Sequence, residues 1–68
     1  MDWRQEVIAY GKESIKELRR AVKEMEAGTY EIRRFSAGSW HVLNREEVAR
    51  AKNNIDRLKK IVEAVEKS

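Results

Sequence analysis

The residues whose types could do chemistry gather between positions 30 and 47, in the stretch YEIRRFSAGSWHVLNREE. This stretch holds the only His of the chain, three of its five aromatic residues and an Arg-Arg pair. Arg beside aromatic side chains suits phosphate contacts with stacked bases, and it suits the anchor residues of a protein interface equally well. We expect a partner to bind five residues here: Arg33, Arg34, Phe35, His41 and Arg45.

Arrangements that catalyse reactions or bind metals are not found in the sequence. The chain has no Cys and a single His, so it offers no recognisable ligand spacing for zinc. Ser14, Ser36 and Ser39 have no base placed to activate them. Glu46 and Glu47 are paired carboxylates, but they lie where the first turn of a helix is expected and where negative charge balances the helix dipole. We therefore expect a protein that is not an enzyme and uses no metal or cofactor.

The length and the charge of the chain further narrow its possible architecture and function. Sixty-eight residues allow one domain, residues 1–68, with a small core. Fifteen Lys and Arg residues oppose twelve Asp and Glu residues in an interleaved pattern, which is not typical of a dedicated nucleic-acid binder. No apolar run approaches the roughly 18–20 residues of a membrane span, and the N-terminal residues do not resemble a signal peptide. We expect an intracellular protein.

An amphipathic helix is predicted over residues 3–27. Its apolar residues recur at spacings of three, four and seven, which places them on one face. Asp2, followed by Gln5, is expected to cap its N-terminus, and Gly28 to end it in the left-handed conformation. Gly11 lies on the apolar face and indicates either a mild helix defect or a close approach of another backbone. The residues of this face are Ile8, Ile15, Leu18, Val22 and Met25.

A second amphipathic helix is predicted over residues 45–66. Asn44 is expected to cap it, with Glu47 completing a capping box and with Leu43 and Val48 forming a hydrophobic staple. Its apolar residues keep an unbroken spacing of three and four, and Ile61 and Ala64 widen the stripe. That stripe consists of Val48, Ala51, Ile55, Leu58, Val62 and Val65.

A β-hairpin is predicted over residues 29–43, between the two helices. Ser36-Ala37-Gly38 favours a type I turn followed by a G1 bulge, because a two-residue primed turn would require a positive φ at Ala37. This register pairs Arg34 with Trp40 and Ile32 with Val42. It places the apolar residues Tyr30, Ile32, Trp40 and Val42 on one face, which would form a lid over one end of the helix pair.

The expected fold class is therefore α+β, with a helix–β-hairpin–helix (αββα) order in which the hairpin caps two long antiparallel helices. With this order, three segments carry a family resemblance: AGTYEI (27–32), LNREEV (43–48) and NIDRL (54–58). The chain resembles, over residues 20–65, the head-completion (head–tail joining) proteins of the lambda W type in tailed phages and related short prophage proteins. The resemblance implies a structural role without enzymatic activity. Many copies would dock beneath the portal of a DNA-filled capsid, close its exit channel and offer a surface to the tail. It also implies a location in the host cytoplasm and in the virion.

Two other functions fit the sequence. One is a small nucleic-acid-binding or regulatory module that uses Arg33, Arg34, His41 and Arg45. The other is a helix-mediated homo-oligomer, because Trp3, Val7 and Tyr10 form a second short apolar stripe. The residues leave open whether the chain is a monomer or a dimer, and no membrane or small-molecule partner is expected.

Overall fold

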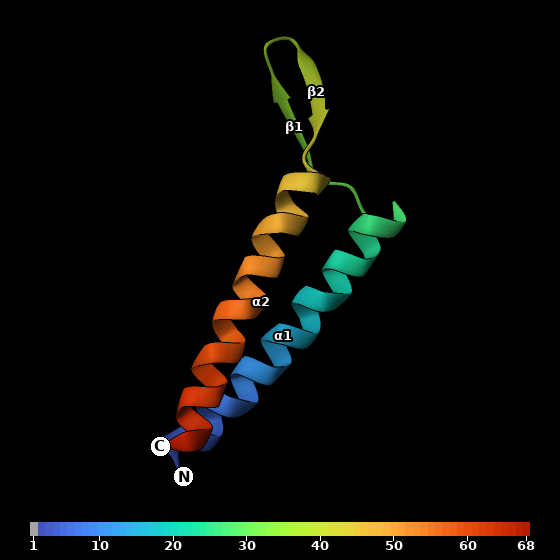
Figure 1. The fold of residues 1–68 in the computed structure, drawn as a ribbon. Helices are drawn as coiled ribbons and strands as arrows, with labels where there is room; N and C mark the ends of the chain where they lie inside the picture. The colour runs from blue at the N-terminus through green and yellow to red at the C-terminus, as the bar shows by residue number, and fades with distance from the viewer. Residues whose placement is uncertain (1) are drawn as a thin grey trace.

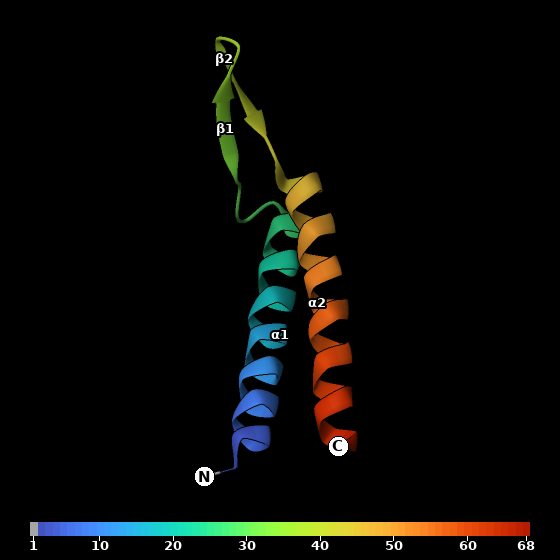
Figure 2. The same cartoon turned by 90° about the vertical axis from the view of Figure 1, so that its left-hand side faces the viewer.

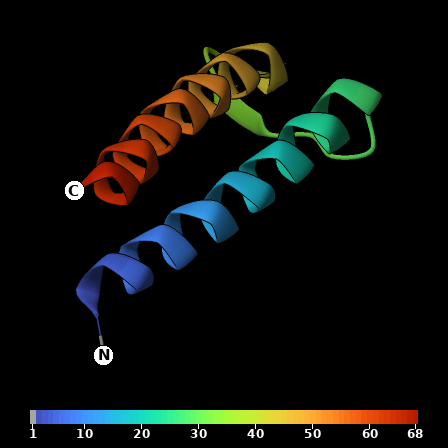
Figure 3. The same cartoon turned by 60° about the horizontal axis from the view of Figure 1, so that its bottom comes forward.

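The chain forms two long helices joined by a β-hairpin, as the sequence predicts (Figure 1). The structure, a computed structural model, describes residues 2–68. It consists of α1 (Trp3–Ala27), β1 (Arg33–Ser36), β2 (Ser39–Val42) and α2 (Asn44–Lys67). The helices lie side by side and antiparallel in all three views (Figures 1, 2 and 3), which gives the described part of the chain a rod shape of 51 × 22 × 18 Å. The α+β class and the αββα order are confirmed.

Both ends of α1 follow the predicted capping chemistry. The carboxylate of Asp2 accepts a hydrogen bond from the N–H of Arg4 at 3.1 Å. Gly28 adopts φ 78°, the N–H of Thr29 donates to the carbonyl of Glu24 at 3.0 Å, and the N–H of Gly28 donates to the carbonyl of Met25 at 3.2 Å. These two bonds form a Schellman motif, which satisfies carbonyls that the helix leaves unpaired.

The core lies between the two predicted apolar stripes. Leu18, Val48 and Leu58 are half-buried against it, whereas Ile61, expected to widen the stripe of α2, is 51% exposed. Each buried residue still keeps 5–8% of its surface exposed, because two helices alone cover only one face of each other. The buried apolar residues are Ile15, Val22, Met25, Ala51, Ile55 and Val62.

Gly11 is a site of close helix approach. It is buried, and a Cβ built on it would lie 2.5 Å from Cγ2 of Val62 on α2. Contacts that short do not occur between real side chains, so with any larger residue either the Val62 side chain or the helices would have to shift. Of the two explanations for Gly11, the close approach is the one that the structure supports.

The predicted hairpin register is wrong by one residue. The strands pair Arg33 with Val42, Arg34 with His41, and Phe35 with Trp40, around a two-residue turn. Ala37 has φ 52° and Gly38 has φ 81°, as a type I′ turn requires. The left-handed conformation costs Ala about 1–2 kcal/mol. The primed turn matches the twist of the strands, and the register brings Phe35 against Trp40, so these gains offset the strain.

The hairpin is not a lid over the helices. It extends beyond their end along the long axis (Figures 1 and 2), and Tyr30, Trp40 and Val42 are 52%, 67% and 55% exposed. Ile32 alone of the four expected lid residues is half-buried. The reason is the connection to α2: only Leu43 lies between the end of β2 and the start of α2, so the strand cannot fold back over the helix end.

Asn44 does not cap α2. The helix begins at Asn44 itself, Leu43 takes the N-cap position without a side-chain hydrogen bond, and the first helical bond runs from Glu47 N–H to the Leu43 carbonyl at 2.9 Å. The Asn44 side chain bonds the segment that leads into β1 instead. Its Oδ1 accepts from the N–H of Ile32 at 2.8 Å, and its Nδ2 donates to the carbonyl of Tyr30 at 2.7 Å.

These bonds fix the hairpin to the helix pair. Asn44 Nδ2 also donates to the carbonyl of Met25 at 3.3 Å, and the Leu43 N–H donates to the Ile32 carbonyl at 2.7 Å. One half-buried amide thus joins the C-terminus of α1, the connection to β1 and the start of α2. The hairpin is thereby held in a defined direction as it leaves the helices.

Candidate functional site

The hairpin presents two faces of different chemistry. Side chains alternate along a strand, and residues directly opposite each other in an antiparallel pair share a face. In the observed register one face, called the aromatic face below, carries Arg33, Phe35, Trp40 and Val42. The other, called the polar face, carries Arg34, Ser36, Ser39 and His41.

The aromatic face is built around one cross-strand ring pair. The centroids of Phe35 and Trp40 lie 5.3 Å apart with their planes tilted by 60°, a favourable aromatic geometry. Both residues are nevertheless exposed, Phe35 by 60% and Trp40 by 67%. Val42 extends the apolar surface on the same face. Beside it, Arg33 Nε donates to Glu31 Oε2 at 2.8 Å, which neutralises this guanidinium.

The polar face contains a Ser–His contact at the turn. Nε2 of His41 lies 3.2 Å from Oγ of Ser39 and 3.1 Å from the backbone carbonyl of Ser36. Both side chains are exposed, and no carboxylate within residues 2–68 hydrogen-bonds the imidazole to orient it. A Ser nucleophile requires an oriented base and a site that excludes water. The contact ties the ring to the turn.

The five residues predicted to bind a partner are divided between places. Arg33 and Phe35 lie on the aromatic face, Arg34 and His41 on the polar face, and the exposed Arg45 in the first turn of α2. The sequence prediction missed Trp40 and Val42, because the expected register assigned both to a buried lid. The feature that could have identified them is the pairing of Phe35 with Trp40, which only the two-residue turn allows.

Metal centres and membrane spans are not found in the described part of the chain. Within residues 2–68, no group of three or more His, Cys, Asp or Glu side chains is placed to hold a metal ion. Neither of the two helices in this range combines the length and the apolar character needed to cross a membrane. The hairpin is a candidate functional surface because it exposes the Phe35–Trp40 pair.

Comparison with known proteins identifies no relative of this chain. No protein-family model, no curated protein and no solved structure matches it. The class that the fold defines is a small αββα protein with a projecting hairpin.

Proposed function

We propose that this chain is a non-enzymatic assembly protein that docks on a protein partner through the aromatic face of its hairpin. The observation that carries the proposal is the exposed Phe35–Trp40 pair. The hairpin that contains this pair projects beyond the helices (Figure 2). Adjacent large apolar rings in water are unfavourable, and patches of this kind are enriched at sites of protein contact. Trp and Arg are also enriched among the residues that contribute most to binding at protein interfaces.

The hairpin is well placed to enter a partner. It projects beyond the helices, so both rings can be covered without a change in the helix pair (Figures 1 and 2). Asn44 holds its base, which limits the conformational freedom that binding would remove. A partner that offers an apolar pocket to Phe35 and Trp40 would complement this surface.

A protein partner is better supported than nucleic acid. Binding to phosphates depends on Lys and Arg side chains that converge on one surface. Arg33 is paired with Glu31, while Arg34 lies on the opposite face of the hairpin. The basic residues of the hairpin therefore do not act together, whereas the two aromatic rings do.

The finer form of the proposal is head–tail joining in a tailed phage. It is supported by the αββα order and by the likeness of AGTYEI, LNREEV and NIDRL to head-completion proteins. Each segment contains a residue that stabilises this fold. Gly28 ends α1, Asn44 hydrogen-bonds the connection to the hairpin, and Ile55 lies in the core. Many copies arranged in a ring could each direct a hairpin into a portal or a tail.

Deletion of the gene from the genome that encodes it tests the finer proposal. Electron microscopy of the resulting lysate should show DNA-filled heads and detached tails, with few infectious particles. Normal virions in normal number would contradict head–tail joining. Binding of the purified protein to DNA or RNA at low salt tests the alternative, because phosphate contacts weaken steeply as salt rises. Strong salt-dependent binding would favour the nucleic-acid function over the proposed one.

A further inference from the structure

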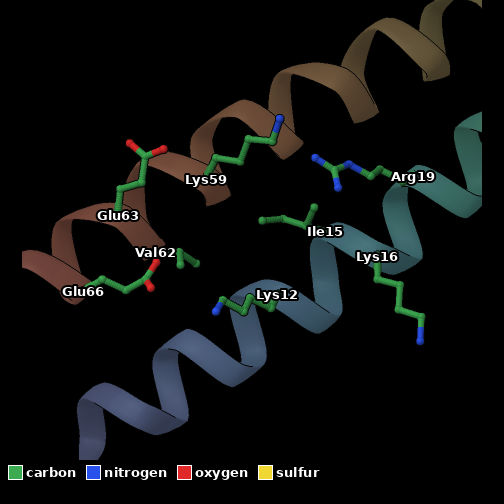
Figure 4. Close-up of a pocket in the computed structure, with 8 residues that line it drawn as sticks. All are labelled: Lys12, Ile15, Lys16, Arg19, Lys59, Val62, Glu63 and Glu66. Carbon is green, nitrogen blue, oxygen red and sulfur yellow. The ribbon is translucent and has the colours of Figure 1, made fainter.

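A second candidate site lies between the helices, away from the hairpin. A groove of about 580 Å³ runs along one side of the helix pair (Figure 4). Ile15 and Val62, both buried, form its floor. Four basic side chains line its walls: Lys12, Lys16 and Arg19 of α1, and Lys59 of α2. The volume falls in the range of pockets that hold small molecules.

The basic residues of α1 form a like-charge row. Positions 12, 16 and 19 are separated by four and three residues, so their side chains lie on one helix face, where like charges repel each other. None of the four cations takes part in an ion pair within residues 2–68. Arg20, the next residue of α1, pairs with Glu24 at 3.5 Å. Arg20 thus has a carboxylate partner on its own helix, whereas the three basic residues of the row form no ion pair within residues 2–68.

At one end of the groove, the charges of the two helices are also mismatched. Where the same two helices meet nearer the hairpin, opposite charges face each other: Nζ of Lys52 lies 3.9 Å from the carboxylate of Glu26. In the groove, Arg19 and Lys59 extend from opposite helices at the same end (Figure 4). The two acidic residues that line it, Glu63 and Glu66, lie one and two turns further along α2. One end of the groove thus has two convergent cations and no lining carboxylate.

We infer that this groove binds a small phosphate monoester, with the phosphate between Arg19 and Lys59 and the organic part over Ile15 and Val62. A guanidinium fork and an ammonium group together suit the charge and geometry of a phosphate. The apolar floor suits an organic substituent. A long polyanion fits less well, because Glu63 and Glu66 would repel its continuation along the groove.

Titration of the 15N-labelled protein with phenyl phosphate tests the inference. The amide resonances of Ile15, Arg19, Lys59 and Val62 should shift in a saturable way. Inorganic phosphate should bind at least threefold more weakly, since it lacks the organic part. Shifts without saturation, or shifts confined to other residues, would overturn the inference.

A matched pair of double variants tests the two cations. R19Q/K59Q should weaken phenyl phosphate binding at least tenfold. R20Q/K60Q removes the same charge from the adjacent positions, which do not line the groove, and should change binding less than twofold. Equal losses in both variants would show a non-specific charge effect and contradict the site. Circular dichroism checks that each variant folds. If R19Q/K59Q does not fold, the single variant K59Q replaces it and should weaken phenyl phosphate binding at least threefold. A smaller loss of affinity would contradict the site.

Discussion

Gly11 of α1 lies so close to Val62 of α2 that there is no room for a side chain at residue 11: a Cβ on Gly11 would lie 2.5 Å from Cγ2 of Val62. Val is β-branched and has one strongly preferred rotamer in a helix, so it cannot easily turn away. The pair therefore sets the distance between α1 and α2 near the end that lies opposite the hairpin.

G11A should destabilise the protein. Overpacking of a close contact costs about 1–3 kcal/mol. The better helix propensity of Ala offsets about 1 kcal/mol of this. We expect a net loss of about 1 kcal/mol, which lowers the Tm by about 4–8 °C in a domain of this size. Thermal unfolding followed by circular dichroism measures it.

The V62A background provides the control for this variant. Removing both γ-carbons leaves Cβ of residue 62 at 4.0 Å from the place that a Cβ of residue 11 would occupy, an ordinary contact distance. In this background G11A should be neutral or stabilising by up to about 1 kcal/mol, from helix propensity alone. A stabilising effect of G11A in the presence of Val62 would show that the helices do not approach closely there.

Ala37→Asn should stabilise the hairpin. Asn tolerates the positive φ observed at residue 37, and Asn-Gly is a preferred type I′ sequence. Relief of the strain at Ala37 by about 0.5–1 kcal/mol would slow amide hydrogen exchange in Arg33–Ser36 about two- to fivefold. In a bulged turn residue 37 would be right-handed and Asn would bring no gain, so unchanged exchange rates would contradict the observed register.

Asn44→Asp distinguishes the helix-capping role predicted for residue 44 from its observed role as a hydrogen-bond donor to the carbonyls of Tyr30 and Met25. At an N-cap, Asp is as good as Asn. In the structure, the two donor bonds of Nδ2 to Tyr30 and Met25 would be lost and replaced by repulsion between oxygens, at a cost of about 1–3 kcal/mol. Chemical denaturation measures the loss, with N53D at an exposed position of α2 as the control. If N44D left the free energy of unfolding unchanged, residue 44 would act as a helix cap, as the sequence predicts, and the observed bonds of Asn44 would be contradicted.

The helices were predictable because the signal for a helix, a regular spacing of apolar residues, is local in the sequence and is repeated along it. Ile15, Val22, Ile55 and Val62 recur with the period of a helix, and each buried position supports the assignment of the next. Gly28 is the C-terminal residue that such a helix requires. Asn44 shows the limit of local rules: its position fits a cap, but its amide meets backbone groups 12 and 14 residues away.

The hairpin register was not predictable by the rule applied to it. That rule assumes that the apolar residues of a strand share a buried face. Trp40 and Val42 are exposed, so burial does not select the register. The choice depends on the turn and on the Phe35–Trp40 contact, and the strain at Ala37 argued against the turn that forms. Arg33 and Phe35 were predicted as site residues, whereas Trp40 was not.

Site-specific photo-crosslinking tests the central claim, that the aromatic face binds a protein partner, most directly. A benzoylphenylalanine at position 35, in the cells that encode the chain, should yield one discrete protein adduct that W40S abolishes. The same group at Tyr10, which is 73% exposed on α1, is the control and should not yield that adduct. Mass spectrometry would identify the partner, which the finer proposal expects to be a portal or tail component. No adduct from position 35, an adduct unaffected by W40S, or one removed by nuclease would contradict the claim.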